Sequence, residues 1–287
     1  MWLIFAIAAT VLFSAYDILS RVLASRTVNP VVYSGIYCLF VSVFSIFLCF
    51  FEPLDIENGT FSLEFIFLCI IGLAVWAAFT RVEYVARKLN EVSRLMVIFR
   101  IAPVITFFFA VIFLGESLTW QKGMALFLTL IANVVVVFSG LKRKSTTGIN
   151  RKGVLIGIIA SIFLGLGWSF DKVLSSHLPL PLYTFSVFFF SGIVTLLVPP
   201  VGKKVIIREF NEMSIIGTAV LALINVVGFF LYLRAFALGD VSSVIIVTSS
   251  ATVIAILLGI VLLKERDDIP YKILGGVMVL IATVILS

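Results

Sequence analysis

The sequence predicts an all-α integral membrane protein with ten transmembrane helices, arranged as two inverted five-helix repeats. Three observations predict this fold: the composition, the lengths of the apolar segments and a similarity between the two halves. Of the 287 residues, 62% are hydrophobic and 13% are charged, whereas soluble domains carry about 25% charged residues. A soluble domain of this length has too small an interior for that many apolar side chains, so the chain is expected to lie in a membrane.

Ten apolar segments follow one another along the chain. They cover residues 2–20, 31–51, 63–80, 91–113, 123–141, 153–170, 180–201, 213–233, 241–263 and 271–286. Each is close to the ~20 residues that a helix needs to cross a bilayer, and the last is short. Because lipid admits only helices and closed barrels, and alternating strand patterns are absent, each segment is interpreted as a helix. The first is not interpreted as a signal peptide, because no basic residue precedes its apolar stretch.

The distribution of basic residues predicts the orientation in the membrane. The net charge is +6, and 17 of the 21 lysines and arginines lie in or beside the odd-numbered connections between helices. Since basic loops stay on the cytoplasmic side, both termini are expected to face outward. The same loops are expected to contact anionic membrane lipid, which explains the charge without a nucleic acid partner.

A basic linker divides the ten segments into five and five. It spans residues 142–152 and reads KRKSTTGINRK, so the predicted units are an N-terminal repeat at 1–141 and a C-terminal repeat at 153–287. SRVLASR at 20–26 aligns with DKVLSSH at 171–177, an offset of 151 residues, and the later motifs LNEVS and LGDVS align at an offset of 149. Five is an odd number, so the second repeat is expected to enter the membrane in the opposite sense.

The segment RIAPVITFFFAVIFLGESLTWQKGMALFLTLIANVVVVF resembles the EamA-like branch of the drug/metabolite transporter superfamily. In that pattern a helix carries a proline and ends in Leu-Gly-Glu, and a short connection leads into a closing helix. Pro103 and residues 114–116 match it. The second repeat departs from it, with Ala251 and Thr252 in place of the proline and Lys264 in place of the glycine. The resemblance covers nearly the whole chain.

The resemblance implies a secondary-active transporter in a plasma (inner) membrane of the bacterial type. Members of the family export amino acids and other small metabolites, carry sugar phosphates or nucleotide sugars, or expel drugs. The substrate expected here is a small polar or anionic metabolite such as an amino acid, and export is the expected direction. No cofactor is expected, and an ion gradient is expected to drive transport, with the proton as the candidate coupling ion.

Three other classes of protein are alternatives to a transporter. An enzyme is not expected, because the sequence has no nucleophile–base pair, no metal-ligand spacing and no Walker glycine loop. A component of a lipid-carrier flippase would need a lateral opening between helices. A membrane partner that transports nothing would have little use for polar residues at the centre of the bilayer.

Pairs of residues related by the repeat are expected to face a cavity between the two halves. The candidate substrate-binding residues are Asp17, Trp76, Arg100, Trp168, Asn225, Tyr232, Ser249 and Thr252. Among them, Arg100 is related to Ser249 and Trp76 to Asn225, and these four fall near mid-depth when residues are counted from the helix ends. Ordinary helix packing is the alternative role for the tryptophans, and a helix–helix hydrogen bond is the alternative for Asn225.

Arg100 is the candidate that is hardest to assign to packing alone. A charge at the centre of a bilayer is costly, so its guanidinium is expected to point into protein or water. It either contacts an anionic group of the substrate or forms a buried ion pair, with Asp17 as the expected partner. Asp17 could instead be neutralised by Arg21, one helical turn further on. Glu116 is expected to lie at the positive end of the helix that follows it, rather than to transfer protons.

Overall fold

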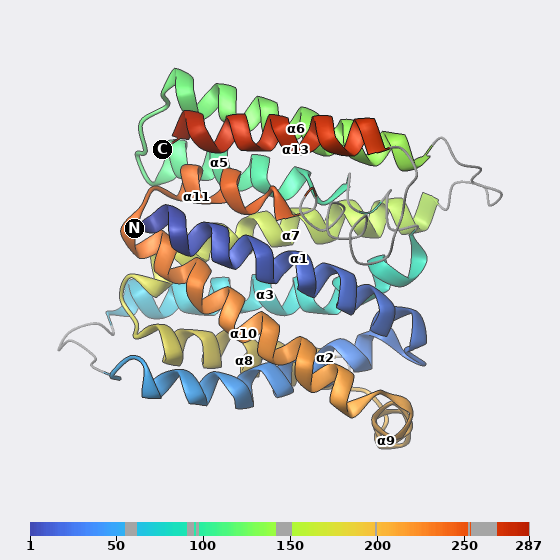
Figure 1. The fold of residues 1–287 in the computed structure, drawn as a ribbon. Coiled ribbons are helices and arrows are strands. Elements are labelled where there is room, and N and C mark those ends of the chain that lie inside the picture. The colour runs from blue at the N-terminus through green and yellow to red at the C-terminus, as the bar shows by residue number, and fades with distance from the viewer. Residues whose placement is uncertain are drawn as a thin grey trace.

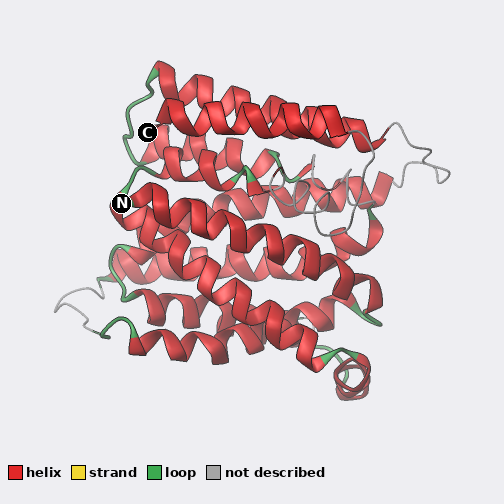
Figure 2. Ribbon diagram, viewed as in Figure 1, coloured by secondary structure: helices red, strands yellow, loops and turns green. Residues whose placement is uncertain are grey.

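The computed structural model describes residues 1–54, 62–90, 95, 98–141, 151–198, 200–251, 253 and 269–286. These residues form eleven α-helices and one 3-10 helix, and no strand occurs among them (Figure 2). The helices are α1 (Trp2–Arg26), α2 (Pro30–Ser45), η1 (Ile46–Phe50), α3 (Leu63–Leu89), α5 (Ile101–Phe113), α6 (Trp120–Leu141), α7 (Arg151–Ser175), α8 (Leu180–Leu197), α9 (Lys203–Glu212), α10 (Ile215–Leu238), α11 (Val241–Thr248) and α13 (Ile269–Leu286). The predicted all-α class is confirmed.

Six of these stretches are long and apolar enough to cross a membrane: α1, α2 with η1, α3, α7, α8 and α10. Shorter apolar helices lie at Ile101–Phe113, Trp120–Val135 and Ile273–Leu286. Large apolar side chains such as Phe67 and Leu280 are exposed on the outside of the bundle. Exposure of so many apolar side chains to water would be unfavourable, whereas contact with lipid tails is not. The predicted multi-pass membrane protein is therefore confirmed.

Side-chain caps fix the starts of three helices. The Asn29 side chain accepts hydrogen bonds from the N–H groups of Val31 and Val32 at the start of α2. The hydroxyls of Ser62 and Ser214 accept in the same way at the starts of α3 and α10. Such caps satisfy N–H groups that have no partner within the helix, so these loop residues determine where each span begins.

The long helices lie side by side and cross the molecule in alternating directions (Figure 1). The most extensive contacts join α1 to α10, α3 to α7, α2 to α8 and α6 to α13. Both termini lie at the same end of the bundle, whereas α6 ends and α7 begins at the opposite end (Figure 1). The last helix of each predicted repeat therefore packs against its counterpart, and the first helix of each packs against a helix of the other half.

The structure differs from the predicted segments at two places, one in each predicted repeat. The segment predicted as one helix over 91–113 is interrupted, because α5 begins only at Ile101 and Arg100 precedes it in a turn. The segment predicted over 241–263 is likewise interrupted after α11, where Ser249 and Ser250 form a turn. Arg100 and Ser249 thus lie at helix breaks and not inside continuous helices.

Helix α9 was not predicted, because its basic residues were assigned to a cytoplasmic loop. Figure 1 shows α9 end-on, so its axis crosses those of the long helices at the end opposite the termini. Basic residues and exposed apolar side chains such as Ile207 and Phe210 share its surface, which is typical of a helix that lies in the membrane interface. Glu209 anchors it to the bundle by accepting a 2.6 Å hydrogen bond from the Asn29 N–H, and burial raises the pKa of this carboxyl.

Small residues permit the closest helix contacts. A Cβ atom added to Gly165 of α7 would lie 2.7 Å from the Ala102 carbonyl oxygen of α5. The backbones of α5 and α7 can approach this closely only because position 165 has no side chain. The contact matters for the cavity described below, because it holds α7 against the helix that follows Arg100.

We expect Gly165→Ala to lower stability by about 1–3 kcal/mol, because the added methyl group must push two backbones apart. Gly123→Ala is the matched control, since a Cβ at Gly123 of α6 meets nothing within 4 Å. The control should be neutral or stabilising by up to about 1 kcal/mol, because alanine favours the helix. Thermal unfolding of both variants in detergent measures the difference, and equal midpoints would contradict the proposed contact.

Candidate substrate-binding site

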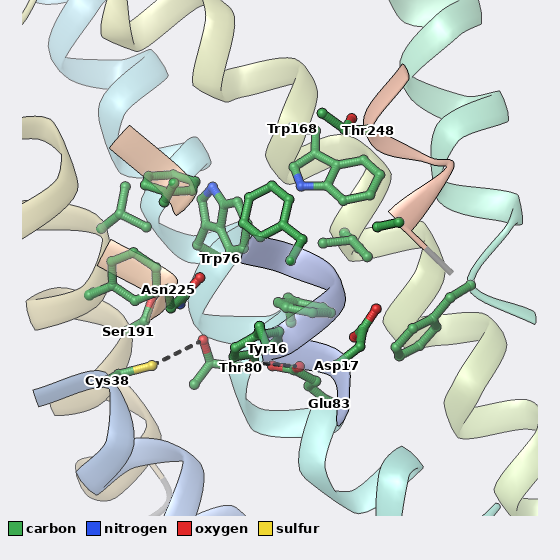
Figure 3. A pocket seen from close by; sticks show the side chains of 18 of the residues that line it. Tyr16, Asp17, Cys38, Trp76, Thr80, Glu83, Trp168, Ser191, Asn225 and Thr248 are labelled. Carbon is green, nitrogen blue, oxygen red and sulfur yellow. Dashed lines mark hydrogen bonds between the residues drawn. The ribbon is translucent and has the colours of Figure 1, made fainter. Parts of the chain in front are cut away.

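A cavity of about 130 Å³ lies at the centre of the bundle, with walls from α1, α2, α3, α7, α8, α10 and α11. Six of the eight predicted binding residues line it: Asp17, Trp76, Arg100, Trp168, Asn225 and Ser249. The indoles of Trp76 and Trp168 form one part of the wall, and Asp17 and Glu83 lie together in another (Figure 3). Residues from both halves of the chain therefore converge on one site.

The remaining two predicted residues have different positions. Tyr232 does not line the cavity but is buried behind its wall, where its ring lies 6.4 Å from the Trp168 ring and 6.0 Å from the Phe229 ring. It supports the aromatic wall from outside. Thr252 lies outside the residues that the structure describes.

The Trp76 indole is held in a defined place. A Cβ on Gly167 of α7 would lie 3.0 Å from the Trp76 ring, so the missing side chain leaves room for the indole to lie on α7. The ring contacts Phe79 and Phe229 edge to face, with centroids 5.6 and 6.0 Å away, a favourable arrangement of aromatic rings. Its Nε1–H donates a 2.8 Å hydrogen bond to Asp171 Oδ1. The indole is therefore held in place as part of the cavity wall.

Asn225 faces a cluster of tyrosines. Its amide nitrogen donates a 2.6 Å hydrogen bond to the Tyr37 hydroxyl. Tyr37 in turn packs against Tyr16, Tyr33 and Tyr84, with ring centroids 5.8–6.5 Å away. The helix–helix hydrogen bond considered for Asn225 is thus present, and the same residue lines the cavity. The two roles are compatible, because an amide has several donor and acceptor positions.

The helix breaks explain how Arg100 is accommodated. In a continuous helix the Ser249 carbonyl would accept from the N–H of residue 253, but the Val253 N–H donates to Ser250 instead. The Ser249 carbonyl is released, and Arg100 Nη1 donates a hydrogen bond to it. A cation at the C-terminal end of α11 is also favoured by the helix dipole.

A second arginine, Arg87, forms the ion pair that had been considered for Arg100. Arg87 is buried and lies 2.9 Å from Glu83 and 3.2 Å from Asp17. The Tyr16 hydroxyl donates to the same Glu83 carboxylate at 3.1 Å, and the guanidinium stacks over the Tyr16 ring at 5.5 Å. Asp17 is therefore paired with Arg87, and the side chain of Arg21 lies outside the described part of the structure.

Arg87 is not among the predicted binding residues, because it lies beside an odd-numbered connection and was interpreted as a cytoplasmic loop charge. A signal was available, since Arg87 follows Glu83 by four residues, the spacing of an ion pair along a helix. Together Asp17, Glu83, Arg87 and Arg100 bring two acidic and two basic side chains to the cavity. The cavity is therefore lined by charged side chains of both signs and by aromatic rings.

Glu116 lies at the start of a helix, as expected, but this helix is α11 and not α6. Its carboxylate accepts hydrogen bonds from the N–H groups of Val241 and Ser242, at 2.6 and 3.0 Å. It therefore caps the first turn of α11 in the other half, whereas the sequence suggested the start of the following helix, α6. Lys122 lies 3.7 Å from this carboxylate and 2.8 Å from Asp240. The Leu-Gly-Glu motif thus ties the two halves together at the end that holds the termini.

Metal chemistry finds no support in the part of the chain that the structure describes, where no group of three or more His, Cys, Asp or Glu side chains could hold an ion. His177 is exposed and packs on the Phe65 ring at 5.1 Å. The arrangement can bind and orient a small polar molecule.

The fold and the cavity define a multi-pass helical membrane protein with a central polar site. The model of the EamA-like transporter family matches residues 1–138 and, a second time, residues 151–287. The chain belongs to the EamA-like transporter family, as the resemblance around the Leu-Gly-Glu motif predicted, and it is a membrane transporter by family.

Two further comparisons bear on the architecture. An uncharacterized protein of Methanocaldococcus jannaschii is 28% identical over 135 residues, which are 47% of this chain and 95% of that protein. One crystal structure of a protein shares the fold with a TM-score of 0.77 and 13% sequence identity, covering 99% of this chain and 97% of the other. The first is thus similar to about half of this chain, and the second to nearly all of it.

We expect Arg87→Ala to destabilise the protein by about 3–5 kcal/mol, because it leaves the buried Glu83 carboxylate and the partly exposed Asp17 carboxylate without their cation. Arg208→Ala is the control, since the Arg208–Glu212 pair is more than half exposed and such pairs contribute at most about 1 kcal/mol. Folded yield and unfolding temperature measure both effects. Adding Asp17→Asn and Glu83→Gln should restore part of the loss, and failure of this rescue would count against the ion-pair network.

Proposed function

We propose that the protein is a secondary-active exporter of small polar or anionic metabolites such as amino acids, working by alternating access around the central cavity. The observation that carries the proposal is the hydrogen bond between Arg100 and Ser249 in the cavity wall. These residues are 149 residues apart, the same offset that aligns the LNEVS and LGDVS motifs. Two equivalent residues can touch only close to the axis that relates the repeats, which is where the substrate site of an inverted-repeat transporter lies.

Equivalent contacts in the two halves support an inverted repeat of five plus five helices. Ser161 of α7 donates a 2.7 Å hydrogen bond to the Ile98 carbonyl, and Thr10 of α1 donates a 3.5 Å bond to the Val247 carbonyl. The offsets of 151 and 149 residues convert one contact into the other. The helix pairs α1–α10 and α7–α3 correspond in the same way, as do α5–α7 and α11–α1.

The double match of the family model and the half-length relative support the same division of the chain, at 1–141 and 153–287. Helices α1 and α7 start from opposite ends of the bundle (Figure 1), as an inverted second repeat requires. Rocking of one repeat against the other around the central site would then expose it to each side of the membrane in turn.

The chemistry of the cavity favours a small substrate that carries both a carboxylate and an ammonium group. The Arg100 guanidinium offers a planar fork of donors that suits a carboxylate, and the Asp17 side chain, 19% exposed, offers an acceptor to an ammonium group. Aromatic faces such as that of Trp168 stabilise a nearby cation further. The cavity volume of about 130 Å³ is below the roughly 300–1,000 Å³ of pockets for drug-sized ligands, which favours a small metabolite.

One observation favours the alternative of a lipid-carrier flippase. A surface groove of about 280 Å³ lies between α3 and α8, with Ala74, Ala77 and Ala78 on its α3 side. Arg81 lines the same groove. An acyl chain fits apolar walls of this kind, with an acidic headgroup near the arginine. A transport assay of the reconstituted protein with fluorescent lipid and with labelled amino acids separates the two functions. Movement of the lipid alone would overturn the proposal.

We expect Arg100→Ala to abolish transport while the protein still folds. Loss of the bond to the Ser249 carbonyl should cost about 1.5–3 kcal/mol, which lowers the unfolding temperature without unfolding the protein. Arg100→Lys keeps the charge but loses the fork, so it should recover only part of the transport. The measurements are metabolite levels in medium and cytoplasm of expressing cells, and uptake of labelled amino acids by proteoliposomes.

Arg208→Ala serves as the control for this experiment, because it also removes one positive charge but lies on α9 and does not line the cavity. It should transport like the wild type. Well-folded Arg100→Ala protein with wild-type transport would show that Arg100 supports only the structure.

Both termini should face outward, because basic residues flank the odd connections and the termini lie at one end of the bundle, opposite basic helix α9 (Figure 1). A C-terminal reporter that is fluorescent only in the cytoplasm should stay dark, and a periplasmic enzyme reporter at the same place should be active. The reverse result would invert the orientation proposed here.

A further inference from the structure

Asp171 is a buried acidic residue that neither the cavity nor the ion-pair network uses. It lies on α7, three residues after Trp168, and its relative exposure is 0%. Two donors reach the same oxygen: Trp76 Nε1–H at 2.8 Å and the Tyr183 hydroxyl at 2.6 Å both bond to Oδ1. The other oxygen, Oδ2, is buried and has no hydrogen-bond partner among the residues that the structure describes.

No cationic side chain compensates this carboxyl within 4.0 Å in the described structure. The adjacent Lys172 is directed elsewhere, since its ammonium donates to the carbonyls of Phe236 and Gly239. The titratable groups that face Asp171 are Tyr183 of α8 and Tyr232 of α10, with Cys69 of α3 next to Tyr183. Helix α5, which also packs on α7, carries no titratable residue.

This environment makes two protonation states accessible. An ionised carboxylate without a cation at membrane depth is costly, and the two hydrogen bonds to Oδ1 offset part of that cost. A neutral acid avoids the buried charge, and Oδ2 is the oxygen that remains open to a proton. Protonation of Asp171 needs no other reactant, because one proton from the solvent converts the carboxylate into the acid and no other bond changes.

Trp76, one of the two donors, links the protonation state of Asp171 to the cavity. A neutral acid is a weaker acceptor than a carboxylate, so protonation loosens the hydrogen bond that holds the Trp76 indole. That indole forms cavity wall and lies on Gly167 with no space to spare. Protonation of Asp171 therefore changes how firmly a residue of the cavity wall is held.

We propose that Asp171 is the proton-binding site of this protein and that Trp76 couples it to the central cavity. The proton site stands on the geometry alone, whereas the coupling rests on the proposed transport function. A transporter that is driven by a proton gradient needs a residue that binds and releases a proton.

Infrared spectra of protein in liposomes test the proton site without any substrate. The wild type should show a carboxylic acid C=O band that appears on acidification and disappears on alkalinisation, and Asp171→Asn should lack it. Asp240→Asn is the control, because Asp240 is mostly exposed, and it should keep the band. A band that does not respond to pH, or one that persists unchanged in Asp171→Asn, would overturn the proposal.

A second pair of variants keeps Asp171 in place, in case Asp171→Asn folds poorly. Tyr183→Phe removes one donor that favours the carboxylate, so the acid band should persist to higher pH than in the wild type. Tyr84→Phe is the matched control, since the buried Tyr84 hydroxyl has no hydrogen-bond partner in the described structure. Identical titrations for the two variants would contradict the assignment to Asp171.

Uptake of labelled amino acids into proteoliposomes tests the coupling. An imposed proton gradient should stimulate wild-type and Asp240→Asn protein, whereas Asp171→Asn should still exchange amino acids across the membrane but lose the stimulation. A gradient response that survives in Asp171→Asn would overturn the coupling. Wild-type protein that moves none of the amino acids would contradict the proposed function together with the coupling, while the infrared titration decides the proton site by itself.

Discussion

The constraint on which this structure depends is that backbone carbonyls at membrane depth must find donors inside the protein. The two interrupted helices release such carbonyls at Ile98 and Ser249, and each is met by a side chain from elsewhere: Ser161 for the first and Arg100 for the second. Ser14 of α1 similarly donates to the Ala251 carbonyl at 2.7 Å. These bonds hold α1 and α7 against the breaks, and the cavity lies between them.

The same constraint accounts for an arginine inside a long apolar segment. Arg100 closes the break after α11 by bonding to the Ser249 carbonyl, so it has a structural role whether or not a substrate is present. A guanidinium has five N–H donors in a rigid fork, and this geometry allows one residue to bond the protein and an incoming anion together. The structural and substrate-binding hypotheses for Arg100 are therefore compatible.

Composition and periodicity predicted the helical membrane fold because twenty-residue apolar runs have few other solutions in lipid. The breaks escaped prediction, since both apolar runs continue past Arg100 and Ser249, and Pro103 was interpreted as part of one continuous helix. Arg87 was misassigned because a loop charge and a buried ion-pair partner look alike one turn from a helix end. The environment of Asp171 depends on contacts with α3 and α8, which alignment of the halves cannot show.

The acidic side chains in and behind the cavity wall are compensated in two different ways. Asp17 and Glu83 share the Arg87 cation, so their charges are compensated within the protein. Asp171 has two neutral donors and, among the described residues, no cation within 4.0 Å, so a proton is the ligand that would neutralise it. A fixed ionic cluster on one side of the cavity and an exchangeable proton behind the Trp76 wall would let the site keep its substrate geometry while one residue changes charge.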